Sequence, residues 1–126
     1  MNLKHVDGLL QVSMQITYQG RKQLIDKLVI DTGAVHTIIS ADAVADIGIF
    51  FQDGDKLISM KGIGGTEYSF RKEVESICFD AIEINQIKLD FGTLEGFDIN
   101  GLIGLDILLV NGFIINLNDL TLEVSK

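Results

Sequence analysis

The chain has 126 residues, of which 47% are hydrophobic and 22% are charged, and these proportions suffice for one domain with a substantial core. Its formal net charge of −8 argues against a nucleic-acid partner, because phosphate binding depends on clustered Lys and Arg side chains. The 13 glycines and the absence of proline indicate glycine turns and no proline-rich linker, so we expect a single domain over residues 1–126.

The cysteine content and the hydropathy of the chain bear on its compartment. Cys78 is the only cysteine, so no disulfide can form within the chain. No apolar stretch has the length of a signal peptide or of a membrane span. We therefore expect a cytoplasmic protein that has no membrane partner.

The N-terminal part of the chain predicts a β-hairpin that ends in an aspartate. Apolar residues alternate with polar residues from Leu10 to Tyr18, which is the period-2 pattern of a half-buried strand. A glycine turn in YQGRKQ then leads to the apolar segment LIDKLVI, so residues 9–31 are expected to pair as two strands. Asp31 therefore lies where the second strand ends.

A short strand and a short helix are expected next. The segment HTIIS predicts the strand, and Ser40 at its end is expected to cap a helix over ADAVADI. Gly48 follows this helix and is well placed as its C-cap. Residues 55–73 then predict two strands joined by a glycine-rich hairpin tip.

The remaining chain also predicts mostly strands. The segments EVESICF, AIEI and QIKLDF are rich in β-branched and aromatic residues, and Asn85-Gln86 is expected to form a turn. The segment GLIGLDILLVNG predicts a very short strand, a glycine, and a helix of about two turns that ends near Gly112. The last segment, FIINLNDLTLEV, predicts a hairpin with Asn118-Asp119 in its turn.

An ordered set of short motifs carries the functional signal. An apolar strand ends in Asp31-Thr32-Gly33-Ala34, a threonine follows at Thr37, and the glycine-rich hairpin comes later. An apolar-apolar-glycine motif, Leu102-Ile103-Gly104, then precedes a helix. The tripeptide D-T-G alone is a weak signal. The whole set, across residues 9–124, resembles the retropepsin-like aspartic proteases in the single-domain form of retroviruses and of small bacterial and cellular relatives.

The resemblance implies a role for each residue of the first motif. Asp31 matches the catalytic aspartate of the family. Thr32 corresponds to the threonine whose hydroxyl braces two active-site loops across a dimer, and Thr37 to a later hydroxyl that braces the loop. Gly33 and Ala34 correspond to small residues that let the loop backbone approach the partner chain and the substrate.

The chemistry of this family needs two carboxylates. They share a proton, and one acts as a base on a water while the other acts as an acid toward the peptide carbonyl oxygen. Two carboxylates that lie this near to each other do not both ionise easily, because their negative charges repel. The pair therefore titrates as a unit. The chain has no second D-T-G or D-S-G. If the protein is an enzyme, Asp31 of a second copy must complete the site, which predicts a homodimer with the site on its two-fold axis.

The glycine-rich hairpin matches the flap of the family, which closes over a bound peptide or protein substrate and excludes water. Its expected tip consists of Gly62, Ile63, Gly64 and Gly65. A plain surface hairpin is the alternative, because glycine-rich turns are common. Apolar side chains near Ile63 and Ile103, beside Gly104, are expected to form the pockets, which predicts a preference for hydrophobic residues around the cleaved bond.

Two positions depart from the retroviral pattern. The retroviral enzymes usually carry an acid directly after D-T-G-A and an arginine after the later glycine, where this chain has Val35 and Leu105. Because both members of this ion pair are absent, the sequence favours the bacterial or cellular branch of the family.

Other polar residues have simpler explanations. Asp106 is expected to cap the helix that it starts, because an acid there interacts favourably with the helix dipole. His36 could tune the two carboxylates or touch substrate, but a lone histidine beside a strand is more often packed or exposed. His5 and His36 with scattered acids give no metal-ligand spacing, and the glycines give no phosphate loop, so neither a metal nor a cofactor is expected.

We therefore expect an all-β fold, a retropepsin-like closed or partly closed barrel with one or two short helices. The expected function is that of a homodimeric aspartic endopeptidase, which hydrolyses peptide bonds through a water activated by two Asp31 carboxylates. Two alternatives stay open. One is a non-catalytic module that binds an extended peptide by β-augmentation, and the other is a monomeric structural β-domain in which Asp31 is only a turn residue.

Overall fold

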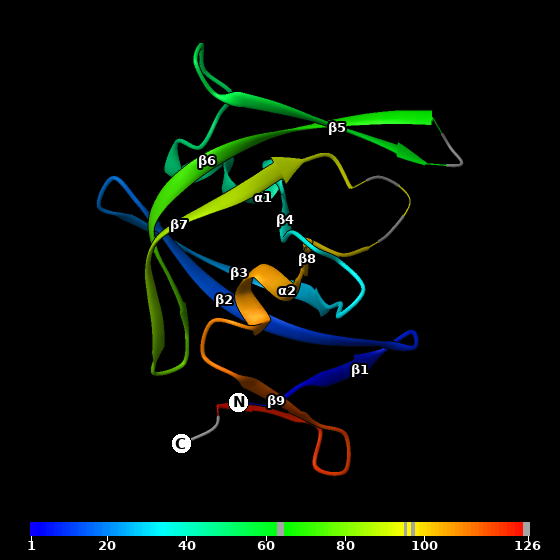
Figure 1. Cartoon of the computed structure of the whole chain (residues 1–126). Helices are drawn as coiled ribbons and strands as arrows, with labels where there is room; N and C mark the ends of the chain where they lie inside the picture. The colour runs from blue at the N-terminus through cyan, green and yellow to red at the C-terminus, as the bar shows by residue number, and fades with distance from the viewer. Residues whose placement is uncertain (63–64, 95, 97, 125–126) are drawn as a thin grey trace.

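The backbone is organised around one large β-sheet that closes on itself (Figure 1). The computed structural model describes residues 1–62, 65–94, 96 and 98–124, and it describes side chains outside residues 60–67. The strands of the sheet are β1 (Lys4–Val6), β2 (Leu9–Tyr18), β3 (Arg21–Ile30), β4 (Ile38–Ser40), β5 (Lys56–Gly62), β6 (Gly65–Phe79), β7 (Ile82–Gly92) and β8 (Gly101–Ile103). They pair in the order β1-β2-β3-β8-β4-β7-β6-β5, and a further pairing of β2 with β6 closes the barrel. The expected all-β barrel is therefore confirmed.

The hairpin expected over residues 9–31 is confirmed as β2 and β3. The two strands pair antiparallel, and Gln19 and Gly20 form the turn with positive φ angles of 49° and 79°. Met14 and Ile16 of β2 are fully buried, as the alternating pattern predicts. Asp31 follows directly after the last residue of β3.

Two parallel pairings bring distant segments together at the end of β3. β8 lies between β3 and β4, and it pairs parallel with β3 and antiparallel with β4. Ile30, which ends β3, lies opposite Ile103, which ends β8. β4 also pairs parallel with β7, where Ile38 lies opposite Asp90. The segments that follow β3 and β8 therefore leave the sheet side by side.

The first helical segment follows β4 directly. α1 (Ala41–Val44) continues as a 3-10 turn, η1 (Ala45–Ile47), and Gly48 ends it with a φ of 86°, which confirms the glycine C-cap. Ser40 precedes α1, but its side chain makes no capping hydrogen bond, so that expectation is wrong. Ser40 still belongs to β4, where its position is fixed by pairing with β7.

The long strands β5, β6 and β7 pair antiparallel in succession. The hairpin expected over residues 55–73 is present as β5 and the start of β6, and its last described pair is Gly62 opposite Gly65. The two residues between them, 63 and 64, lie outside the described residues. In Figure 1 this hairpin lies at the opposite end of the molecule from the chain termini.

The turn predicted at Asn85-Gln86 is wrong. Asn85 lies opposite Ser76 inside the continuous strand β7, and the chain instead turns at Asp80-Ala81, between β6 and β7. Asp80 has a φ of 50°, a conformation that aspartate adopts more readily than most residues. Turn-forming residues are therefore present at Asp80-Ala81 and at Asn85-Gln86, and the pairing of β6 with β7 puts the turn at Asp80-Ala81.

The C-terminal part adds α2 (Leu105–Leu108) and a separate two-stranded sheet of β9 (Phe113–Asn116) and β10 (Thr121–Val124). α2 is a single turn, shorter than the two turns expected, because residues 109–112 form turns that end at Gly112, with a φ of 61°. The final hairpin and its turn over Asn118-Asp119 are confirmed. None of the helices in the described part of the chain has the length and apolar character of a membrane-spanning helix.

One hydrophobic core fills the barrel and is contributed by most of the strands. Its fully buried members include Phe79 of β6, Phe91 of β7 and Ile107 of α2. Leu122 of β10 belongs to the same core, so the small C-terminal sheet packs on the barrel. This packing holds the two segments that leave β3 and β8.

Candidate active site

Asp31 is oriented by its own loop. Its backbone N–H donates to the carbonyl of Ile103 at 2.9 Å, which continues the pairing of β3 with β8. Its side-chain Oδ1 accepts a hydrogen bond from the N–H of Gly33, also at 2.9 Å, and the residue is half-buried. A Cβ at Gly33 would lie 3.2 Å from this Oδ1, so a larger residue would crowd the carboxylate.

The loop after Asp31 is fastened to the start of α2 through its backbone. The carbonyl of Ala34 accepts from Leu105 at 2.8 Å, and the carbonyl of Val35 accepts from Asp106 at 3.2 Å. Gly104 lies against the same loop, because a Cβ there would be 2.7 Å from the Ala34 carbonyl oxygen. This approach is closer than any side chain allows, so the position requires glycine.

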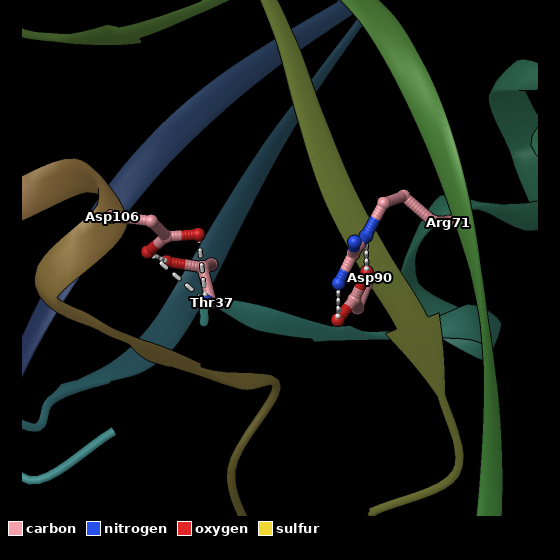
Figure 2. A network of polar contacts seen from close by, with 4 residues as sticks. All are labelled: Thr37, Arg71, Asp90 and Asp106. Atoms are coloured by element: carbon pink, nitrogen blue, oxygen red, sulfur yellow. Dashed lines mark hydrogen bonds and ion pairs between the residues drawn. The ribbon is translucent and has the colours of Figure 1, made fainter. Parts of the chain in front are cut away.

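Thr37 is the most heavily bonded residue of the loop, and it is fully buried. Its Oγ1 donates to Oδ1 of Asp106 at 2.7 Å, and its N–H donates to both carboxylate oxygens of Asp106 at 3.0 and 2.9 Å (Figure 2). The N–H of Gly104 donates to the same Oγ1 at 2.9 Å. Thr37 therefore joins the D-T-G loop to the Gly104 motif.

Asp106 has a wider role than the helix cap expected of it. Its Oδ1 does accept from the N–H of Ile107 within α2, at 2.9 Å, but its main partner is Thr37. The sequence shows an acid at a helix start, which is the only local signal. Its partner lies 69 residues away, so sequence reasoning missed this contact.

A second carboxylate that sequence reasoning missed lies on the other side of Thr37. Asp90 is 5% exposed, and it forms a two-pronged ion pair with Arg71, at 2.7 Å from Nε to Oδ1 and 3.2 Å from Nη2 to Oδ2 (Figure 2). The hydrogen bonds with Asp90 raise the pKa of Arg71 above its usual value. An acid within the apolar segment QIKLDF was the only available signal.

The other residues singled out from the sequence are distributed around this loop. Thr32 and Gly33 are exposed, Ala34 is half-buried, and His36 is exposed. Gly62 and Gly65 end the described part of the β5–β6 hairpin, whereas Ile63 and Gly64 lie outside the described residues. Ile103 is fully buried in the core, and its backbone carbonyl accepts the hydrogen bond from Asp31.

The surface pockets formed by described residues include two near the N-terminus, with volumes of about 410 and 210 Å³. Asn2, Val12 and Ser13 line both pockets, and Asp31 lines neither. Within the described ranges, no three His, Cys, Asp or Glu side chains are grouped as metal ligands. The candidate site is therefore the loop from Asp31 to Thr37, with Gly104 and Asp106 beside it.

Comparisons with known proteins place this loop in a wider context. A family model described as gag-polyprotein putative aspartyl protease matches residues 14–109, which include Asp31 and Gly104. Among solved structures, the chain is similar to the crystal structure of a retropepsin-like aspartic protease from Rickettsia conorii, with a TM-score of 0.69 and 22% sequence identity. The match covers 96% of this chain and 86% of that one, so the two share a fold. No curated protein matches the sequence.

Proposed function

The chain belongs to the gag-polyprotein putative aspartyl protease family, and from this premise we propose that it is a homodimeric aspartic endopeptidase. The observation that carries the proposal is the placement of Asp31. Its carboxylate is held by the N–H of Gly33 on a loop whose Thr32 and Gly33 are exposed. An acid fixed in this way, directly after β3 and only half-buried, is open to a partner and to a substrate.

The proposed reaction uses two copies of Asp31, one from each protomer. One carboxylate takes a proton from a water, the water attacks the peptide carbonyl, and the other carboxylate gives its proton to the carbonyl oxygen. Thr32, Gly33 and Ala34 support the loop where the two protomers meet, and Thr37 supports it from inside the protomer. No covalent intermediate and no cofactor are needed.

The proposed substrate is an extended peptide that lies between the D-T-G loop and the β5–β6 hairpin, which acts as a flap through Gly62, Ile63, Gly64 and Gly65. Gly104 supports the loop through its close contact with the Ala34 carbonyl. We expect hydrophobic residues around the cleaved bond, because the loop after Asp31 exposes the apolar side chain of Val35. A cleavage profile in which charged residues dominate both sides of the cut contradicts this preference. A cytoplasmic location stays a prediction from the sequence.

The experiment that tests the proposal compares the wild type with Asp31→Asn on an unfolded protein substrate from about pH 4 to about pH 8. Asp53→Asn is the control, because Asp53 is also a loop acid, is exposed, and lies outside the D-T-G loop. We expect cleavage by the wild type and by Asp53→Asn only. Equal cleavage by all three variants, or by none, contradicts an aspartic endopeptidase.

Sedimentation of the same samples separates the two alternatives. A wild type that dimerises and binds peptides without cutting them is a binding module that uses β-augmentation. A strict monomer at high concentration cannot bring two copies of Asp31 together, and it supports a structural β-domain instead.

A further inference from the structure

Two aspartates hold the chain at Thr37 from opposite sides, Asp106 through its carboxylate and Asp90 through its backbone N–H. Asp106 of α2 accepts hydrogen bonds from the side chain and the N–H of Thr37. On the other side, the N–H of Asp90 donates to the Thr37 carbonyl at 3.4 Å, as part of the pairing of β4 with β7. Figure 2 shows Thr37 with Asp106 on one side and the Asp90–Arg71 pair on the other. Thr37 is thus held through its side chain, its N–H and its carbonyl.

The Arg71–Asp90 pair lies on the face of the sheet that points away from the core. Leu89 and Phe91 of β7 are fully buried in the core, and alternation along the strand directs Asp90 to the opposite face. Asp90 is nevertheless 5% exposed, so the neighbouring segments cover it. The ion pair therefore joins a buried carboxylate, next to the loop and separate from the hydrophobic core, to the half-buried side chain of Arg71.

A buried ion pair at this place needs an explanation other than stability. Removing two charges from water costs about as much as their attraction returns, and apolar residues of similar size often stabilise a fold equally well. What the pair does provide is a fixed orientation of the Asp90 side chain, because an arginine that makes two hydrogen bonds fixes the plane of the carboxylate. The loop meets α2 at Val35 and Leu105, and neither residue is charged. The charged residues that orient this loop are therefore Asp90 and Asp106.

We propose that Arg71 and Asp90 are positioning residues for the catalytic loop. The ion pair joins β6 to β7 at Asp90, the residue whose backbone N–H donates to the Thr37 carbonyl, and Thr37 connects this position to Gly104 and Asp106. Arg71 lies on β6, the strand that also forms one side of the flap, so the same pair fixes the flap strand relative to Asp31. The inference rests on the proposed function.

The adjacent residue supplies a matched control. Lys72 follows Arg71 on β6 and forms a comparably buried ion pair with Asp55, at 2.7 Å, with side chains 7% and 17% exposed. Lys72 also donates to the Gln52 side chain at 3.1 Å, so this pair holds the loop before β5. The Lys72–Asp55 pair therefore resembles the Arg71–Asp90 pair in burial, and in both pairs the cation belongs to β6. The Lys72 side chain lies on the other face of β6 from Arg71, because the two residues are adjacent in the strand.

The test replaces each ion pair by apolar residues and compares the two double variants, Arg71→Met/Asp90→Leu and Lys72→Met/Asp55→Leu. We expect the first to lower kcat about 10- to 100-fold with KM changed less than about threefold, because a displaced catalytic group costs turnover more than binding. We expect the second to keep kcat near the wild-type value. Arg71→Lys keeps the charge without the two-pronged geometry, and we expect an intermediate kcat.

Amide hydrogen exchange gives a readout that does not depend on cleavage. We expect the N–H groups of Thr37 and Gly104 to exchange at least about tenfold faster in the first double variant and at the wild-type rate in the second. Equal kcat values and equal exchange rates in the two double variants overturn the inference. If the wild type itself cleaves nothing, the proposed function fails, and the exchange rates alone decide whether the pair positions the loop. If the first double variant does not fold, Arg71→Lys decides on the same two readouts.

Discussion

Thr37 and Asp106 are joined by three hydrogen bonds although 69 residues separate them in the sequence. One bond comes from the Thr37 hydroxyl and two come from its N–H, so the threonine offers both of its donors to one carboxylate. The hydroxyl oxygen also accepts from Gly104. Hydrogen bonds therefore join a residue that ends the D-T-G loop directly to a residue of α2 within the same chain.

Thr37→Val should destabilise the protein although it preserves the shape of the side chain. The substitution leaves the buried N–H of Gly104 without its acceptor and removes one donor from Asp106, which costs about 1–3 kcal/mol. Urea unfolding at fixed protein concentration measures the loss. Thr37→Ser keeps the hydroxyl and should lose less, so a larger loss in Thr37→Ser than in Thr37→Val contradicts the role given to the hydroxyl.

Gly33 and Gly104 should respond differently to alanine. At Gly104 the new Cβ would lie 2.7 Å from a backbone oxygen, so the loop must shift and both stability and activity should fall. At Gly33 the Cβ would meet only the Asp31 side chain, at 3.2 Å, so activity should fall while the melting temperature changes little. Thermal unfolding and peptide cleavage of the two variants check this contrast. A lower melting temperature for Gly33→Ala than for Gly104→Ala would contradict it.

Asp55 should make the stability of the protein depend on acid. The hydrogen bond from Lys72, and then that from the backbone of Gln52, lowers the pKa of Asp55 below its ordinary value of 3.8. Because the folded state binds the proton less readily, the contribution of Asp55 to stability is complete above about pH 5 and is lost as the pH falls through 3.8 and below.

Asp55→Asn should accordingly lower the melting temperature at neutral pH, and the difference from the wild type should narrow below about pH 4. Melting curves at a series of pH values measure this difference. Asp53→Asn, at a nearby exposed acid, is the control and should show no such narrowing. A difference that stays constant from neutral to acid pH contradicts the assignment.

Cleavage should depend on protein concentration more steeply than linearly. Each protomer supplies one Asp31 to the proposed site. Dilution below the dimer dissociation constant should therefore lower the activity per unit mass of protein, because the protomers separate. Initial rates over a dilution series, with sedimentation at the same concentrations, measure the effect. A specific activity that is constant while the protein becomes monomeric contradicts a shared site.

Local patterns in the sequence predicted the parts of the fold that local interactions determine. Alternation from Leu10 to Tyr18 predicted β2, and Gly48 predicted the end of η1, because each depends on residues close in the chain. The turn predicted at Asn85-Gln86 failed because β7 pairs with β6 on both sides of Gln86, although Gln86 itself has a φ of 52°. The turn propensity of a residue contains no information about the strand with which it pairs.

The candidate site was predictable only in its motifs. The D-T-G loop and Gly104 could be read from short sequence patterns, and the structure places them side by side. The ion pair of Arg71 with Asp90 and the bonds of Thr37 with Asp106 could not be predicted, because each joins residues on different strands or segments through side chains. An isolated acid in a strand gives no indication of which cation it meets.

The insertion of β8 between β3 and β4 has a consequence for how the protein is made. The two strands that flank the D-T-G loop, β3 and β4, precede β5, β6 and β7 in the chain, and the strand that joins them, β8, follows all of these. Contacts between segments so distant in the chain form late in folding. In a nascent chain, the loop that carries Asp31 therefore lacks its β8 partner until residues 101–103 have been synthesised.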